Sequence, residues 1–149
     1  YRRFTEDVDI LVTRQGLEKI HAELEGLGYV PPFTGSKNLR DTESGVKIEF
    51  LLAGQYPGDG KPKPVEFPNP DAANEVVEGI QVLTLPSVVE LKLASGLTNP
   101  LRLKDIVDVQ ELIQRLDLPL DLSNQLNPFV RNKYRELWQI IQDNPVPPE

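Results

Sequence analysis

Two acids alternate with apolar residues at the start of a β-branched run, and this pattern constrains the fold more than any other part of the chain. Asp7 and Asp9 flank Val8, and an apolar run follows at residues 10–12. The alternation and the run together predict a buried strand within residues 4–13. Because successive side chains on a strand point to opposite faces, both carboxylates lie on one face, ~6.6 Å apart along the chain.

A helix is expected directly after this strand. Leu17, Ile20, Leu24 and Leu27 recur at spacings of three and four residues, which places them on one helical face. Gly28 occupies the position of a helix C-terminal glycine. The chain therefore begins with a strand and a helix in succession.

A second acid-bearing strand is expected in a β-hairpin. Residues 37–41 and 46–53 flank the turn residues at 43–45, which have the composition and length of a hairpin loop. On the second arm Phe50 points to one side and Glu49 to the other. Glu49 thus interrupts an otherwise apolar strand.

The remainder of the chain predicts a long loop and then mostly helices. Residues 54–72 are rich in glycine and proline, which favours a surface loop that is either a lid beside Glu49 or a simple connection. Short strands are expected around Glu78 and Gly79, and three helices between about 86 and 143. We predict one α/β domain over residues 1–149, a mixed sheet with helices packed on it.

Composition excludes several classes of protein. The chain has no cysteine, which removes thiol catalysis and Cys-ligated metal centres, and its net charge of −7 disfavours coating of nucleic acid. No run approaches the ~20 apolar residues that span a bilayer, and the N-terminus lacks the apolar stretch of a signal peptide, so we expect a cytoplasmic protein without a membrane partner. Because the chain contains no methionine, we expect it to be a piece of a longer polypeptide, cut at its front end.

The three acids indicate a site for divalent cations. Carboxylates gathered on neighbouring strands repel one another unless a cation neutralises them, and Mg²⁺ prefers carboxylate oxygens. Such a trio is typical of two-metal phosphoryl or nucleotidyl transfer. Asp-x-Asp is too short a motif to decide by itself, and the alternative is that all three acids face water.

Four stretches, taken in order, resemble the nucleotidyltransferase superfamily with the polymerase-β-like fold, and within it the minimal and abortive-infection-type transferases. These stretches are residues 5–12, 46–51, 91–93 and 102–108. The resemblance implies transfer of a nucleoside monophosphate from a nucleoside triphosphate to an acceptor hydroxyl, with Mg²⁺ or Mn²⁺ as cofactor. The acceptor, which could be a small molecule, a tRNA end or a protein, stays open.

The resemblance also implies roles for single residues. Asp7 and Asp9 match the first two metal ligands and catalytic acids, and Glu49 matches the third acid, where the family more often has Asp. Lys92 matches a lysine that contacts the triphosphate, and Asp105 matches a downstream aspartate that supports the site. The alternative is that Lys92 extends to solvent and that Asp105 forms ordinary surface ion pairs.

The chain departs from the family at its front. The family's helix and glycine pair lie just upstream of the first strand, and Tyr1 begins after them; Arg2 and Arg3 are the remaining candidates there for phosphate contact. Because backbone donors at that turn hold the triphosphate, this chain can keep the sheet and lack productive nucleotide binding. A non-catalytic binding or regulatory module, for example one half of a toxin–antitoxin pair, is therefore the second functional hypothesis.

Overall fold

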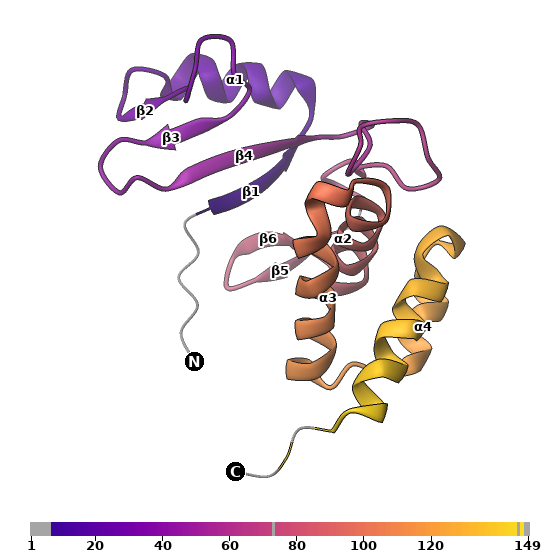
Figure 1. The fold of residues 1–149 in the computed structure, drawn as a ribbon. Coiled ribbons are helices and arrows are strands. Elements are labelled where there is room, and N and C mark those ends of the chain that lie inside the picture. The colour runs from indigo at the N-terminus through magenta and orange to yellow at the C-terminus, as the bar shows by residue number, and fades with distance from the viewer. Residues whose placement is uncertain (1–6, 73, 146, 148–149) are drawn as a thin grey trace. The chain divides into compact units, whose positions relative to one another are not determined.

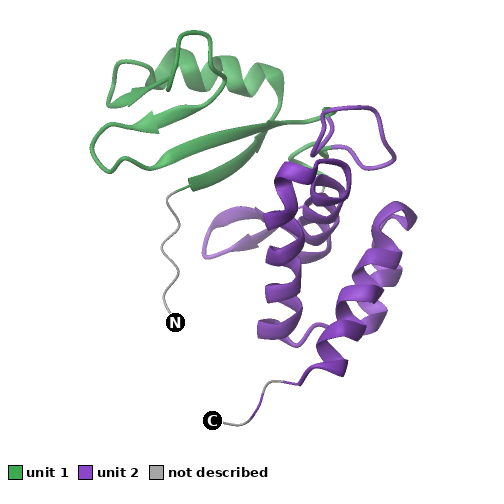
Figure 2. Cartoon of the chain, viewed as in Figure 1, with its two compact units in different colours: residues 1–55, 67–72 green, residues 56–66, 73–149 purple. Residues whose placement is uncertain are grey.

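The computed structural model describes residues 7–72, 74–145 and 147, and it combines mixed β-structure with packed helices (Figure 1). The chain divides into two compact units, drawn in separate colours in Figure 2. Unit 1 comprises residues 1–55 and 67–72, and unit 2 comprises residues 56–66 and 73–149. The expected mixed α/β architecture is thereby confirmed.

Unit 1 is a four-stranded mixed sheet with one long helix. The sheet has the order β1-β4-β3-β2, in which β1 runs parallel to β4 and the other neighbours are antiparallel. The predicted hairpin is confirmed as β3 and β4, with a shorter first arm. The elements are β1 (Asp7–Val12), α1 (Arg14–Leu24), β2 (Tyr29–Val30), β3 (Leu39–Asp41) and β4 (Lys47–Leu52).

The core of unit 1 lies on one face of this sheet. Leu17 of α1 packs in one cluster with Phe50 and Leu52 of β4, so α1 covers the face to which these β4 side chains point (Figure 1). Since side chains alternate along a strand, Glu49 points to the opposite face. The sequence pattern of β4 therefore assigns its acid to the side away from α1.

Three details of unit 1 differ from the sequence expectation, and one is the two-residue strand β2, which the sequence analysis does not predict. The first strand is not buried: residues 7–10 are exposed because β1 is an edge strand that pairs only with β4. The helix ends at Leu24 rather than near Gly28, because Glu25 adopts an extended conformation, and Leu27 is exposed. Thr13 begins the helix by accepting a hydrogen bond from the backbone N–H of Gly16 at 3.0 Å.

Unit 2 consists of a small hairpin followed by helices. The hairpin strands form a separate two-stranded sheet, and the three expected helices are confirmed as α2, α3 and α4. Asn127 begins α4 as an N-cap ahead of a proline, as its sequence indicates. The elements are β5 (Asn74–Val77), β6 (Ile80–Leu83), α2 (Leu85–Thr98), the 3₁₀ turn Pro100–Arg102, α3 (Leu103–Leu116), the 3₁₀ turn Leu120–Gln125 and α4 (Pro128–Asp143).

The helices of unit 2 pack closely around fully buried side chains. Val89, Val109 and Tyr134 supply this core from α2, α3 and α4 in turn. Gly96 lets α2 approach α3, because a Cβ there would meet Ile106 Cδ1 at 2.6 Å. Within the described part of the chain, no helix is both long and apolar enough to cross a membrane.

Candidate functional site

The acids of unit 1 lie side by side on two parallel strands. Asp9 is the register partner of Glu49, and Asp7 is the partner of Lys47. Partners on neighbouring parallel strands point to the same face and lie about 4.8 Å apart at their backbones. Asp7, Asp9 and Glu49 therefore share the face that α1 leaves uncovered.

The three carboxylates share a face but do not converge on one point. Asp7 and Asp9 are exposed and Glu49 is half-buried. Across residues 7–72, 74–145 and 147, no group of three or more Asp, Glu or His side chains is placed to hold a metal ion. The donor chemistry still fits Mg²⁺, which takes oxygen ligands and is usually held by one or two carboxylates together with substrate phosphates.

The site residues expected in the last third of the chain meet between two helices of unit 2. Lys92 on α2 donates a hydrogen bond from Nζ to Asp108 Oδ2 at 2.9 Å, and its Nζ lies 3.7 Å from Asp105 Oδ1. All three side chains are partly buried. Lys92 is thus held by two carboxylates of α3 rather than simply extending to solvent.

Two further residues belong to this charged cluster. Ser95 donates its hydroxyl hydrogen to Asp105 Oδ2 at 2.6 Å. Arg102 donates from Nε to Ser95 Oγ at 2.9 Å and to Asp105 Oδ2 at 3.2 Å. We call Lys92, Ser95, Arg102, Asp105 and Asp108 the α2–α3 cluster.

Sequence reasoning missed Ser95 as a member of this cluster. The available signal was its spacing, because a residue three positions after Lys92 on a helix lies on the same face. Arg102 stands three residues before Asp105, and the two side chains form an ion pair at 3.2 Å. Arg3, proposed for phosphate contact, lies outside the described residues, as does Arg2.

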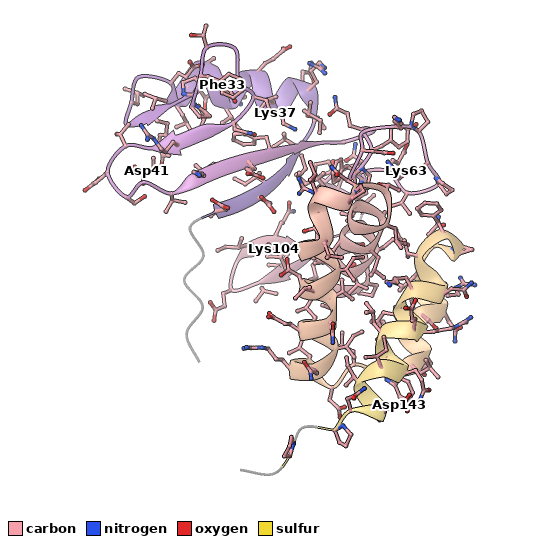
Figure 3. The ribbon with its side chains drawn as sticks, viewed as in Figure 1. Phe33, Lys37, Asp41, Lys63, Lys104 and Asp143 are labelled. Carbon is pink, nitrogen blue, oxygen red and sulfur yellow. The ribbon has the colours of Figure 1, made fainter. Side chains whose placement is uncertain are left out.

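Residues 56–66 of the glycine-rich loop belong to unit 2 and pack within it. Lys63, labelled in Figure 3, has a side chain that is only 4% exposed. Its ammonium group donates to the carbonyls of Pro57 and Lys61 and to Asp59 Oδ1, at 2.6 to 2.7 Å. Gly58 is pressed against α2, where an added Cβ would lie 2.7 Å from the Ser95 carbonyl oxygen. This geometry favours the structural connection over the lid.

His21, the single histidine of the sequence, has a structural environment in unit 1. Its Nε2 lies 2.6 Å from the Lys37 carbonyl oxygen and its Nδ1 lies 3.0 Å from Glu25 Oε2. The ring also contacts Phe50 at a centroid distance of 6.1 Å. His21 therefore ties α1 to the segment before β3.

Each unit has a cavity among its described residues that no candidate residue lines. The cavity of unit 1, about 320 Å³, lies where β1 meets α1 and is bordered by Thr13, Gly16 and Asp71. The cavity of unit 2, about 230 Å³, lies between the C-terminal ends of α3 and α4. The candidate residues thus lie on the sheet face opposite α1 and in a helix–helix interface.

No family model, no curated protein and no solved structure matches this chain. Function is therefore inferred from the two sets of side chains described above.

Proposed function

We propose that the protein is a metal-dependent nucleotidyltransferase that moves a nucleoside monophosphate from a nucleoside triphosphate to an acceptor hydroxyl. The observation that carries this proposal is the register of β1 and β4, which sets Asp9 beside Glu49 on the uncovered face, with Asp7 two residues away. Like charges directly opposite on neighbouring strands are destabilising. A function that requires the negative charges of Asp9 and Glu49 would explain why two acids stand side by side despite this repulsion.

Each acid has a proposed role. Asp7 and Asp9 would hold Mg²⁺ or Mn²⁺, and Glu49 would contribute to a second ion. When bound, such an ion supplies positive charge that neutralises the phosphate oxygens as charge develops. Glu49 would also accept the proton of the acceptor hydroxyl, because it stands beside Asp9 and is the most buried of the three acids.

The proposed reaction forms one bond and breaks one bond at the α-phosphorus. The acceptor oxygen forms a bond to the α-phosphorus of the nucleotide, and the bond from that phosphorus to the β-phosphate oxygen breaks. Pyrophosphate leaves, and the acceptor proton passes to the Glu49 carboxylate. By the sequence resemblance, Lys92 would contact a triphosphate through its ammonium group, and Asp105, whose Oδ1 lies 3.7 Å from Lys92 Nζ, would position Lys92.

A binding or regulatory module without catalysis is the second candidate. It is favoured by the pairing of Lys92 with two carboxylates, since a phosphate would have to compete with Asp105 and Asp108 for this ammonium group. Part of a toxin–antitoxin pair would suit such a module. Under either candidate we propose a cytoplasmic location, and for the enzyme an acceptor that is a small molecule, a tRNA end or a protein.

Transfer of label separates the two candidates. The chain is incubated with α-labelled nucleoside triphosphates, Mg²⁺ or Mn²⁺ and the three classes of acceptor, and label in the acceptor and released pyrophosphate are measured. The proposal predicts metal-dependent transfer that falls at least ~100-fold in Asp9→Asn, with Asp71→Asn of the same unit as a matched control. Undiminished transfer by Asp9→Asn overturns the mechanism, and a chain that transfers nothing with any acceptor favours the module.

A further inference from the structure

We propose that Arg102 is a second phosphate-binding side chain beside Lys92, and that Ser95 is the residue that positions it. The ligand class is an oligophosphate, and the inference rests on the proposed nucleotide substrate. It adds a residue that the sequence resemblance did not assign.

Arg102 is held along one edge of its guanidinium group. Its Nε donates to Ser95 Oγ and to Asp105 Oδ2, so one edge of the planar guanidinium is fixed. A rigid plane that is fixed at Nε also has fixed directions at its other two nitrogens. Among the residues that the structure describes, Nη1 and Nη2 make no hydrogen bond or ion pair.

The other end of the Arg102 guanidinium group is accessible from solvent. The Arg102 side chain is 51% exposed, although the Asp105 carboxylate that it binds is largely buried. The free end of the guanidinium is therefore available to a ligand from solvent. An arginine presented in this way matches the oxygens of a phosphate, which accept two parallel N–H bonds.

Ser95 is a buried residue that bonds both Arg102 and Asp105. This residue is 5% exposed, and its hydroxyl accepts from Arg102 and donates to Asp105. Asp105 also lies beside Lys92. The buried Ser95 hydroxyl therefore bonds a carboxylate that contacts both Lys92 and Arg102. Ser95 thus acts on a bound phosphate through Arg102 rather than by touching it.

The charged side chains around Arg102 also affect the binding of an oligophosphate. The chain carries a net charge of −7, so an oligophosphate needs a local group of cations to bind. Lys92 and Arg102 lie at the α2–α3 cluster, and the exposed Lys104, labelled in Figure 3, follows Arg102 by two residues. Within the α2–α3 cluster, Lys92 and Arg102 balance the charges of Asp105 and Asp108, and Lys104 adds one further positive charge nearby in the sequence.

The test measures phosphate binding in the absence of metal, so that the acids of unit 1 do not contribute. Inorganic tripolyphosphate is titrated into the chain by calorimetry in buffer containing a chelator. Arg102→Gln should weaken binding by about tenfold or more, the size expected for loss of a charge-assisted hydrogen bond. Arg102→Lys and Ser95→Ala should show smaller losses, and Arg40→Gln, which removes an exposed arginine of β3, should bind as the unmodified chain does.

A second measurement does not depend on whether the variants fold. In the unmodified chain labelled with ¹⁵N, the Arg102 side-chain signals should shift on addition of tripolyphosphate. Equal affinities for Arg102→Gln and Arg40→Gln, unshifted Arg102 signals, or no binding of tripolyphosphate would each overturn the inference. Failure of the transfer assay with intact tripolyphosphate binding would instead remove the proposed reaction and leave the phosphate site in place.

Discussion

Ser95 on α2 and Asp105 on α3 are joined by a 2.6 Å hydrogen bond between the serine hydroxyl and the aspartate carboxylate. The same carboxylate accepts from Arg102 and lies beside Lys92. Four polar groups therefore meet where two helices cross. The positions of the two side chains proposed to bind phosphate, Lys92 and Arg102, depend on how closely α2, α3 and the 56–66 loop pack together.

The contact between the loop and α2 predicts an unequal response of two glycines. Gly58 and Gly60 both have positive φ, +77° and +73°, so alanine strains the backbone at either position by about 1 kcal/mol. At Gly58 the new Cβ would also meet Thr98 and the Ser95 backbone, whereas at Gly60 no atom lies within 4 Å. We expect Gly58→Ala to lower the free energy of unfolding by at least ~1 kcal/mol more than Gly60→Ala.

Urea unfolding followed by far-ultraviolet circular dichroism measures this difference. Gly60→Ala is the matched control because it changes the same conformation in open space. Equal losses in the two variants would show that the loop does not press on α2.

The buried ammonium group of Lys63 predicts a second difference in stability. Lys63→Met leaves two backbone carbonyls and the Asp59 carboxylate without their shared donor, and should lower the free energy of unfolding by roughly 1.5–3 kcal/mol. Lys61→Met, at an exposed side chain of the same loop, should change it by less than about 0.5 kcal/mol.

The pKa of Asp59 reports the same interaction independently. The hydrogen bond from Lys63 is the main cause that lowers the pKa of Asp59 below its usual value, followed by the bond from the Lys61 backbone N–H. Lys63→Met should therefore raise this pKa toward the ordinary range in a carboxyl NMR titration. An unchanged titration would mean that Lys63 does not hold the loop.

Tyr134 predicts a loss of stability at high pH. Its hydroxyl donates to the Pro119 carbonyl oxygen at 2.8 Å, and burial, with a smaller effect from the charge of Asp121, raises its pKa from 10 to about 12. The unfolded chain loses this proton near pH 10, while the folded chain retains it to about pH 12. The folded state thus binds more protons within this window, and the free energy of unfolding falls as pH rises from 10 to 12.

Comparison with Tyr134→Phe isolates this effect. The variant lacks the titrating group, so its stability should fall less between pH 10 and 12, although alkaline effects common to both chains persist. Parallel curves for the two chains would show that the phenol of Tyr134 titrates as an exposed tyrosine does.

Most of the order of strands and helices could be predicted because it depends on local patterns, but the two-residue strand β2 was not predicted. The alternation at residues 7–12, the hairpin turn at 43–45 and the cap at Asn127 each depend on neighbours within a few residues. Burial of β1 could not be predicted in this way, because it depends on which strand pairs with it and on what covers each face. The expected burial was wrong for that reason, and the helix end near Gly28 was wrong because the extended conformation of Glu25 left no distinctive signal.

In the candidate site too, residue spacing along one strand could be predicted, whereas contacts between separate helices could not. Residue spacing correctly placed Asp7 and Asp9 on one face, and the register of β4 then set Glu49 on that face too. The spacing from Lys92 indicates the helix face of Ser95, but it does not indicate the partner Asp105, which lies on another helix. Whether the chain is one domain stays a prediction. The chain passes between its two compact units at residues 55–56, 66–67 and 72–73, in or at the end of the glycine- and proline-rich stretch 54–72.

The most direct test of the proposed acidic site uses Mn²⁺ as a paramagnetic probe in NMR of the ¹⁵N-labelled chain, with and without a nucleoside triphosphate. The account predicts selective broadening of the backbone signals of residues 7–9 and 47–49, abolished in Asp9→Asn and retained in the control Asp71→Asn. Broadening centred elsewhere in the chain, or broadening at residues 7–9 that persists in Asp9→Asn, would contradict a metal site formed by Asp7, Asp9 and Glu49.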